Sequence, residues 1–207
     1  MYPAFLVLII ILSYILLRSV SASLLSLIVI FLSILPSMGS AGWLEYQVLP
    51  PLIIAPIIIL TIALAHAIHI LSIALSNMNE GMQKDKAIIE SMKINFTPVF
   101  LTSFTTAVGV AGVNFGNIPA FSQMANAVVF GAAYSFVLSV TVLPALFMMM
   151  PIKSDGKNNI ILPALHALGN FIFKFKYYVI TFISLITVFL ISLIPTLYFD
   201  DDFDAYF

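Results

Sequence analysis

The chain has 207 residues, of which 62% are hydrophobic and only 8% are charged, and its formal net charge is −1. Soluble domains carry about 25% charged residues, so this composition leaves too little polar surface for a globule in water and indicates that lipid surrounds most of the chain. The near-neutral charge argues against a partner nucleic acid. The absence of cysteine excludes a disulfide framework and a thiolate metal site.

Long apolar runs predict an all-α fold, a polytopic transmembrane helix bundle. A spanning helix needs about 20 mostly apolar residues. Six segments meet or approach this length, and they are residues 2–17, 20–38, 48–75, 98–115, 121–150 and 178–198. The runs are continuous rather than alternating, and backbone groups in lipid must be satisfied within a helix or a closed barrel, so spanning strands are excluded.

The basic residues fall in alternate connections between these segments. They are Arg18, Lys84, Lys86, Lys93, Lys153, Lys157, Lys174 and Lys176. The other connections, residues 39–47 and 116–120, contain no Lys or Arg, and neither does the C-terminal tail. The positive-inside rule therefore predicts a multi-pass protein of the inner membrane with its basic connections in the cytoplasm and both chain ends outside it.

The spans and connections predict four parts. They are a five-helix block at residues 1–150, a cytoplasmic linker at 151–177, a sixth span at 178–198 and the start of a truncated extracytoplasmic domain at 199–207. Within the block, residues 80–96 place Ile88, Ile89 and Met92 at helical spacing, opposite Lys and Glu side chains. This pattern predicts an amphipathic helix on the cytoplasmic membrane face, with an ordinary charged loop as the alternative.

Two histidines interrupt an apolar face of the third span. His66 and His69 lie three residues apart and therefore share one side of a helix. Ionisable residues inside a span are costly and usually mark ion or proton paths. Three interpretations stay open: neutral rings bonded to neighbouring helices, a metal site, or a proton-responsive pair. Zinc needs a third ligand, and the only other histidine, His166, lies in the linker, so we predict neither a metal nor another cofactor.

The fourth and fifth spans carry polar side chains of their own. Those of the fourth span are Thr102, Ser103, Thr105 and Thr106, and those of the fifth include Asn126 and a ladder of small residues at Ala127, Gly131 and Ser135. Small and hydroxyl residues let helices approach closely and form hydrogen bonds between them. Plain helix packing accounts for most of these positions, and a polar route beside the histidines is the alternative.

The order of several motifs resembles the resistance–nodulation–division superfamily of exporters, in its MMPL branch related to sterol-sensing domains. The matching stretches are "LLRSVSASLL", "LPPLIIAPIIILTIALAHAIHIL", "EGMQKDKAIIESMKINFTPVFLTSFTTAVGV" and "GAAYSFVLSVTVLPALF". The final "FDDDFDAYF" resembles the start of that family's second extracytoplasmic domain. The resemblance implies that the chain holds the last five helices of one half of an exporter and the first helix of the other half.

This resemblance implies a non-enzymatic, proton-motive-force-driven exporter of hydrophobic or lipid-like molecules. Relatives read "ADAIHIL" where this chain reads "AHAIHIL", so the family's proton-carrying Asp corresponds to His66 and the following histidine to His69. The implied relay is this pair, supported by the polar face of Thr102, Ser103, Thr105, Thr106 and Asn126. The implied partners are membrane lipids, a lipidic substrate, the missing second half and, in a homo-oligomer, a second copy. The alternative is a non-transporting lipid sensor or membrane scaffold.

Overall fold

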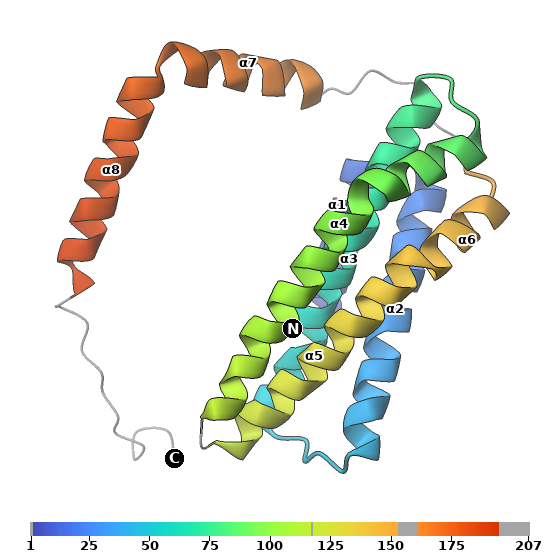
Figure 1. The fold of residues 1–207 in the computed structure, drawn as a ribbon, viewed down its shortest axis with the longest axis vertical. Helices are drawn as coiled ribbons and strands as arrows, with labels where there is room; N and C mark the ends of the chain where they lie inside the picture. Colours follow the sequence, from blue (N-terminus) through green and yellow to red (C-terminus); the bar gives the residue numbers. More distant parts are fainter. Residues whose placement is uncertain (1, 117, 153–160, 195–207) are drawn as a thin grey trace. The chain divides into compact units, whose positions relative to one another are not determined.

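A computed structural model of the chain describes residues 2–116, 118–152 and 161–194. Every regular element in these ranges is a helix (Figure 1). The chain divides into two compact units, residues 1–156 and 157–207. The all-α, polytopic helix bundle predicted from the apolar runs is confirmed.

The helices follow one another along the chain with short connections. The first unit contains α1 (Tyr2–Leu17), α2 (Val20–Trp43), α3 (Pro50–Asn79), α4 (Lys84–Ala111), the 3-10 helix η1 (Gly112–Phe115), α5 (Pro119–Val140) and α6 (Val142–Met149). The second unit contains α7 (Ile161–Lys174) and α8 (Lys176–Ser192).

The described residues contain four helices that are long and apolar enough to cross a membrane. They are α2, α3, α4 continued by η1, and α5 continued by α6. A fifth span results only if α7 and α8, which meet at 87°, are counted together, and the apolar stretch Val7–Leu17 of α1 is shorter. The predicted count of six spans is therefore not confirmed. Residues 153–160 of the predicted linker, the end of the predicted sixth span and the whole of 199–207 lie outside the described part.

The predicted amphipathic segment and the fourth span form one continuous helix, α4. Pro98 lies inside this helix, as neighbouring helices and hydroxyl side chains allow in a membrane. Of the predicted apolar face, Ile88 is buried in the bundle, whereas Ile89 is 55% exposed. The location of this end of α4 on the membrane surface stays a prediction.

The predicted fifth span is interrupted near its end. α5 stops at Val140 and α6 begins at Val142, with Thr141 between them. Pro144 has no backbone N–H and its ring would crowd the carbonyl of Val140, which favours a break in the helix at this point. The sequence contained this signal in "TVLPALF".

Helices α3 and α5 form the centre of the first unit. Helix α3 packs against α1, α2, α4 and α5, and α5 packs against α2, α3, α4, α6 and η1. Helices α3 and α5 approach closely at Gly131, where an added Cβ would overlap the side chain of Ile59. Ile59 is completely buried. The missing side chain of Gly131 therefore lets α3 and α5 approach closely one helical turn before Ser135.

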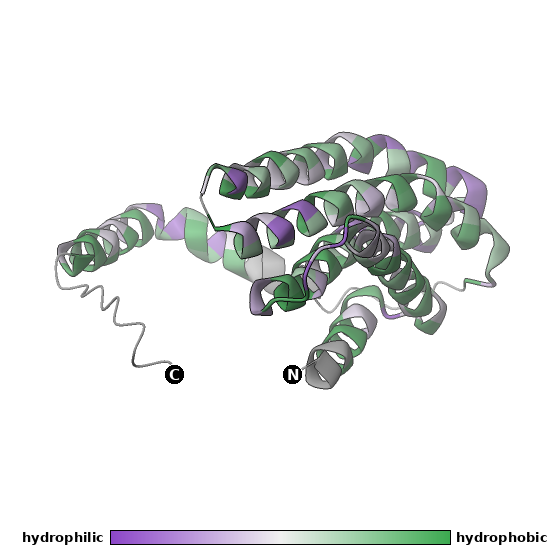
Figure 2. Ribbon diagram, turned by 90° about the horizontal axis from the view of Figure 1, so that it is seen from below, coloured by the Kyte–Doolittle hydropathy of each residue, from purple (hydrophilic) through white to green (hydrophobic). Residues whose placement is uncertain are grey.

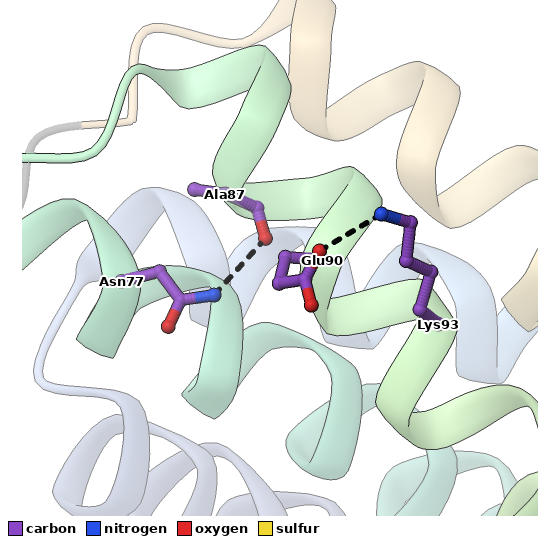
Figure 3. Close-up of polar contacts among 4 residues, drawn as sticks. All are labelled: Asn77, Ala87, Glu90 and Lys93. Carbon is purple, nitrogen blue, oxygen red and sulfur yellow. Dashed lines mark hydrogen bonds and ion pairs between the residues drawn. The ribbon is translucent and has the colours of Figure 1, made fainter.

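One end of the bundle joins the start of α2, the α3–α4 connection and the end of α6. The Lys84 ammonium donates to the carbonyl oxygens of Met148 (3.1 Å) and Met150 (2.5 Å). The Ser21 hydroxyl donates to the Pro151 carbonyl at 3.4 Å. Across the α3–α4 turn, Asn77 donates to the Ala87 carbonyl at 3.5 Å (Figure 3). These contacts place the basic connections of the described bundle at the same end.

Hydrophobic residues predominate along the helices (Figure 2), and many large hydrophobic side chains are exposed. On α4, for example, Leu101, Phe104 and Val108 are each more than half exposed. An apolar surface of this extent fits lipid as the surrounding solvent. The ion pair between Glu90 and Lys93 (3.0 Å) lies near the start of α4, at the basic end (Figure 3).

We expect Gly131→Ala to destabilise the bundle by about 1–3 kcal/mol, because the new methyl group overlaps Ile59. Thermal unfolding of the purified protein in detergent measures this effect. Gly109→Ala is the matched control, because a Cβ at Gly109 meets nothing within 4 Å. Equal unfolding temperatures for both variants would show that α3 and α5 do not approach closely at Gly131.

Candidate functional site

The strongest site in the described bundle surrounds His66. Its side chain is only 2% exposed and is bonded to residues of both α4 and α5. Because lipid offers no hydrogen-bond partner, the ring depends on these neighbouring helices for its polar contacts.

The Nε2 side of the ring meets α4. Nε2 lies 3.3 Å from Oγ1 of Thr102 and 3.3 Å from Oγ of Ser103. The Thr102 hydroxyl also lies 3.0 Å from the carbonyl oxygens of both Pro98 and Val99, to which it can donate. Thr102 can therefore direct its hydrogen to its own backbone and accept a hydrogen bond from the ring.

The Nδ1 side of the ring meets α5, where the Ser135 hydroxyl lies 2.9 Å away. A hydroxyl both donates and accepts, so either neutral tautomer of His66 is satisfied by these partners. A doubly protonated ring donates from both nitrogens, and Ser135 and Thr102 can then both act as acceptors. The site can hold the ring with one or with two protons, and the difference changes hydrogen bonds to two other helices.

The second predicted relay residue points elsewhere. His69 is exposed on the surface of the described bundle, whereas His66 is buried. Three residues along a helix rotate a side chain by about 60° from the starting direction, and here that rotation carries the ring out of the helix interface. The expectation that His66 and His69 share one face of the helix is therefore not met, because only His66 is enclosed. The backbone carbonyl of His69 does bind the bundle, because it accepts a hydrogen bond from Asn95 at 3.2 Å.

Only some residues of the predicted polar face lie near His66. Thr102 and Ser103 contact His66. Thr105 is exposed and donates to the carbonyls of its own helix, and Thr106 is half-buried.

Asn126 belongs to a separate polar cluster. Its Nδ2 donates to the Tyr46 hydroxyl at 3.2 Å, and its Oδ1 accepts from Asn114 at 2.9 Å. Asn126 is therefore not a partner of His66.

Ser135 is the functional residue that the sequence interpretation treated only as part of a packing ladder. The signal for it was its spacing from Gly131, one helical turn earlier on α5. One turn further on, the Ser139 hydroxyl is fully buried and has no hydrogen-bond partner. Asn95 and Ser91 of α4 also bind α3, through the carbonyls of His69 and Ile70.

No group of three His, Cys, Asp or Glu residues that could hold a metal gathers within the described ranges. The partners of His66 found there are hydroxyl groups, which are weaker candidates for metal coordination than imidazole or carboxylate. The chemistry that this arrangement supports is proton binding and hydrogen-bond exchange.

An apolar bundle with an ionisable group in its interior defines a multi-pass membrane protein with a polar internal site. Residues 2–158 match the model of the MMPL family, and the chain belongs to this family. Neither a curated protein nor a solved structure matches it. Family membership confirms the resemblance found in the motifs and supports transport of lipid-like molecules, since MMPL proteins are transporters rather than enzymes.

Ser135 and Ser139 offer a matched test of the site. We expect Ser135→Ala to lower the free energy of unfolding by about 1–3 kcal/mol, because it removes the partner of a buried ring nitrogen. Ser139→Ala removes a buried hydroxyl without a partner and should be neutral or stabilising. Unfolding in detergent compares the two variants. A larger loss for Ser139→Ala than for Ser135→Ala would contradict the described hydrogen bonds.

Proposed function

We propose that the chain is the transmembrane part of a proton-motive-force-driven exporter of hydrophobic or lipid-like molecules, and that His66 carries the proton. The observation that carries this proposal is the burial of His66 between three helices, with a hydroxyl partner for each ring nitrogen. A proton that enters here changes the hydrogen bonds of α3 to α4 and to α5 together. Loading and release of the proton thus alter how these helices pack.

The charge cycle differs from that of an aspartate. A carboxylate alternates between negative and neutral, whereas His66 alternates between neutral and positive. Each cycle still moves one proton, which is worth about 2.3 kcal/mol per 100 mV of membrane potential. The cationic ring needs acceptors rather than donors, and the hydroxyls of Thr102 and Ser135 supply them.

The exposed side of α3 is the proposed contact with the second half of the exporter. Thr61, His69 and Ser72 are exposed on this helix. The hydroxyls of Thr61 and Ser72 donate to carbonyl oxygens of their own helix, at 2.7 Å and 3.2 Å. An ionisable ring such as that of His69 is costly to leave facing acyl chains. A helix of the second half would cover this face and give the His69 ring a polar partner.

We expect His66→Gln to abolish gradient-driven transport while the protein folds normally. A glutamine amide can donate and accept hydrogen bonds to Ser135 and Thr102, but it cannot carry a proton. Efflux of a hydrophobic fluorescent dye measures this, with and without a proton uncoupler, in cells that express the variant together with the second half of the proposed exporter. His66→Asp, which restores the residue of the relatives, should retain uncoupler-sensitive efflux.

A His66→Gln variant that exports at the original rate would eliminate His66 as the carrier. That outcome favours the alternative, a lipid sensor or scaffold that does not use a proton gradient. Loss of efflux in the presence and absence of the uncoupler, together with a lowered unfolding temperature, would instead identify His66 as a purely structural residue.

The proposed orientation places the basic connections in the cytoplasm. The chain has no cysteine, so single-cysteine variants are labelled at one position only. Val48 is 79% exposed in the α2–α3 connection, and Lys86 is exposed at the opposite end. We expect a membrane-impermeant maleimide to label Val48→Cys on intact cells and to reach Lys86→Cys only after lysis. The reverse pattern would overturn the orientation.

A further inference from the structure

A cavity of about 310 Å³ lies at the end of the bundle opposite the basic connections. Its lining includes Met38, Ala41 and Gly42 of α2, Tyr46 of the connection, and Leu52 and Pro56 of α3. We propose that this cavity, here called the Tyr46 cavity, binds the acyl chain of an amphiphile whose uncharged, hydroxyl-bearing head lies beside Tyr46 and Asn126.

The residues that line the cavity indicate that it binds the hydrocarbon part of the ligand. None of the described residues that line the Tyr46 cavity is charged. Its volume lies at the lower end of the range for small-molecule sites, which is about 300–1,000 Å³. Burial of hydrocarbon in such a cavity is favourable by roughly 25 cal/mol for each Å² removed from water. The cavity thus suits one chain segment rather than a whole two-chain lipid.

Tyr46 connects the cavity to a polar cluster. Its ring belongs to the lining, while its hydroxyl accepts a hydrogen bond from Asn126 at 3.2 Å. The hydrogen of the Tyr46 hydroxyl is then available for an oxygen of the ligand. Asn126 is held in place by Asn114 at 2.9 Å. These groups are neutral and so match hydroxyl or ester oxygens rather than a phosphate or an ammonium group.

The position of the cavity indicates that its ligand enters from the bilayer. Trp43 follows the cavity residue Gly42 and is 86% exposed. Tryptophan and tyrosine gather at the membrane–water interface, where lipid heads lie. An amphiphile at this level can place its head at the polar cluster and its chain in the cavity. Such an amphiphile belongs to the class of molecules that we propose is exported, so this inference rests on the proposed function. Its binding is nevertheless measured without transport.

Trp43 is the only tryptophan of the chain and reports directly on the site. The probe is a monoacylglycerol with a brominated acyl chain, titrated into nanodiscs that contain the protein. We expect it to quench Trp43 fluorescence saturably. Gly42→Leu should abolish the saturable phase, because Gly42 lines the cavity and a Cβ there meets no described atom within 4 Å, which leaves room for the larger side chain. Gly39→Leu is the matched control, because it also meets open space on α2 but does not line the cavity, and it should bind normally.

Tyr46→Phe keeps the ring and removes only the hydroxyl. This variant should bind the monoacylglycerol more weakly than the original protein does. A brominated alkane, which has no head group, should bind equally well to the variant and to the original protein. Quenching that rises linearly and equally in the original chain and in both glycine variants would show contact with bulk lipid only and would overturn the proposal. Saturable binding that Tyr46→Phe leaves unchanged would overturn the assigned head-group contact.

The titration uses no pH gradient, and it is repeated with His66→Gln. Retained binding in that variant is the expected result, because His66 lies outside the Tyr46 cavity. Failure of binding in the original chain would remove this site and leave proton coupling intact. Failure of proton coupling would leave the binding site in place.

Discussion

A buried imidazole in a lipid-surrounded bundle has to find its hydrogen-bond partners on neighbouring helices. Both ring nitrogens of His66 meet this requirement through hydroxyl groups, with Ser135 on α5 and Thr102 and Ser103 on α4. Those contacts require α3 and α5 to approach closely, which the absent side chain of Gly131 permits. The central position of α3, the small-residue ladder of α5 and the polar site are consequences of the same constraint.

The hydroxyl partners also define how the site responds to a proton. A carboxylate partner would hold the second proton on the ring by charge attraction, whereas hydroxyl groups accept it with a hydrogen bond only. Thr102 has two carbonyl oxygens to which its own hydrogen can turn when the ring becomes a donor. In the proposed mechanism, the proton reorganises contacts among three helices without requiring a buried ion pair. This is the physical link between the structure and the coupled transport that we propose.

Much of this arrangement is readable in the sequence, and the remainder depends on packing. The apolar runs predict the helices, and the positions of His66, Thr102 and Ser103 predict a polar contact between spans. The outward direction of His69 was not predictable, because a rotation of about 60° separates the two rings and only the neighbouring helices decide which one is enclosed.

The boundaries of the spans are likewise predictable from the sequence in part and dependent on packing in part. Residues 121–150 are predicted as one span, whereas the helix is interrupted before Pro144, and this proline in "TVLPALF" is the signal that the prediction missed. Pro98 does not interrupt α4, although its chemistry is identical. The difference lies in the surroundings that satisfy the freed backbone groups, which no local pattern records. The pairing of Asn126 with Tyr46 also joins residues 80 positions apart and could not be found from spacing.

The central claim is that the His66 ring gains and loses a second proton while it remains inside the folded bundle. Nitrogen-15 NMR of labelled histidine tests it directly, in nanodiscs and in a variant with His69 and His166 replaced by asparagine. The account predicts that the His66 signals change from a neutral ring to a doubly protonated ring as the pH is lowered, while the helices stay folded. A ring that stays neutral until the protein unfolds would contradict the account.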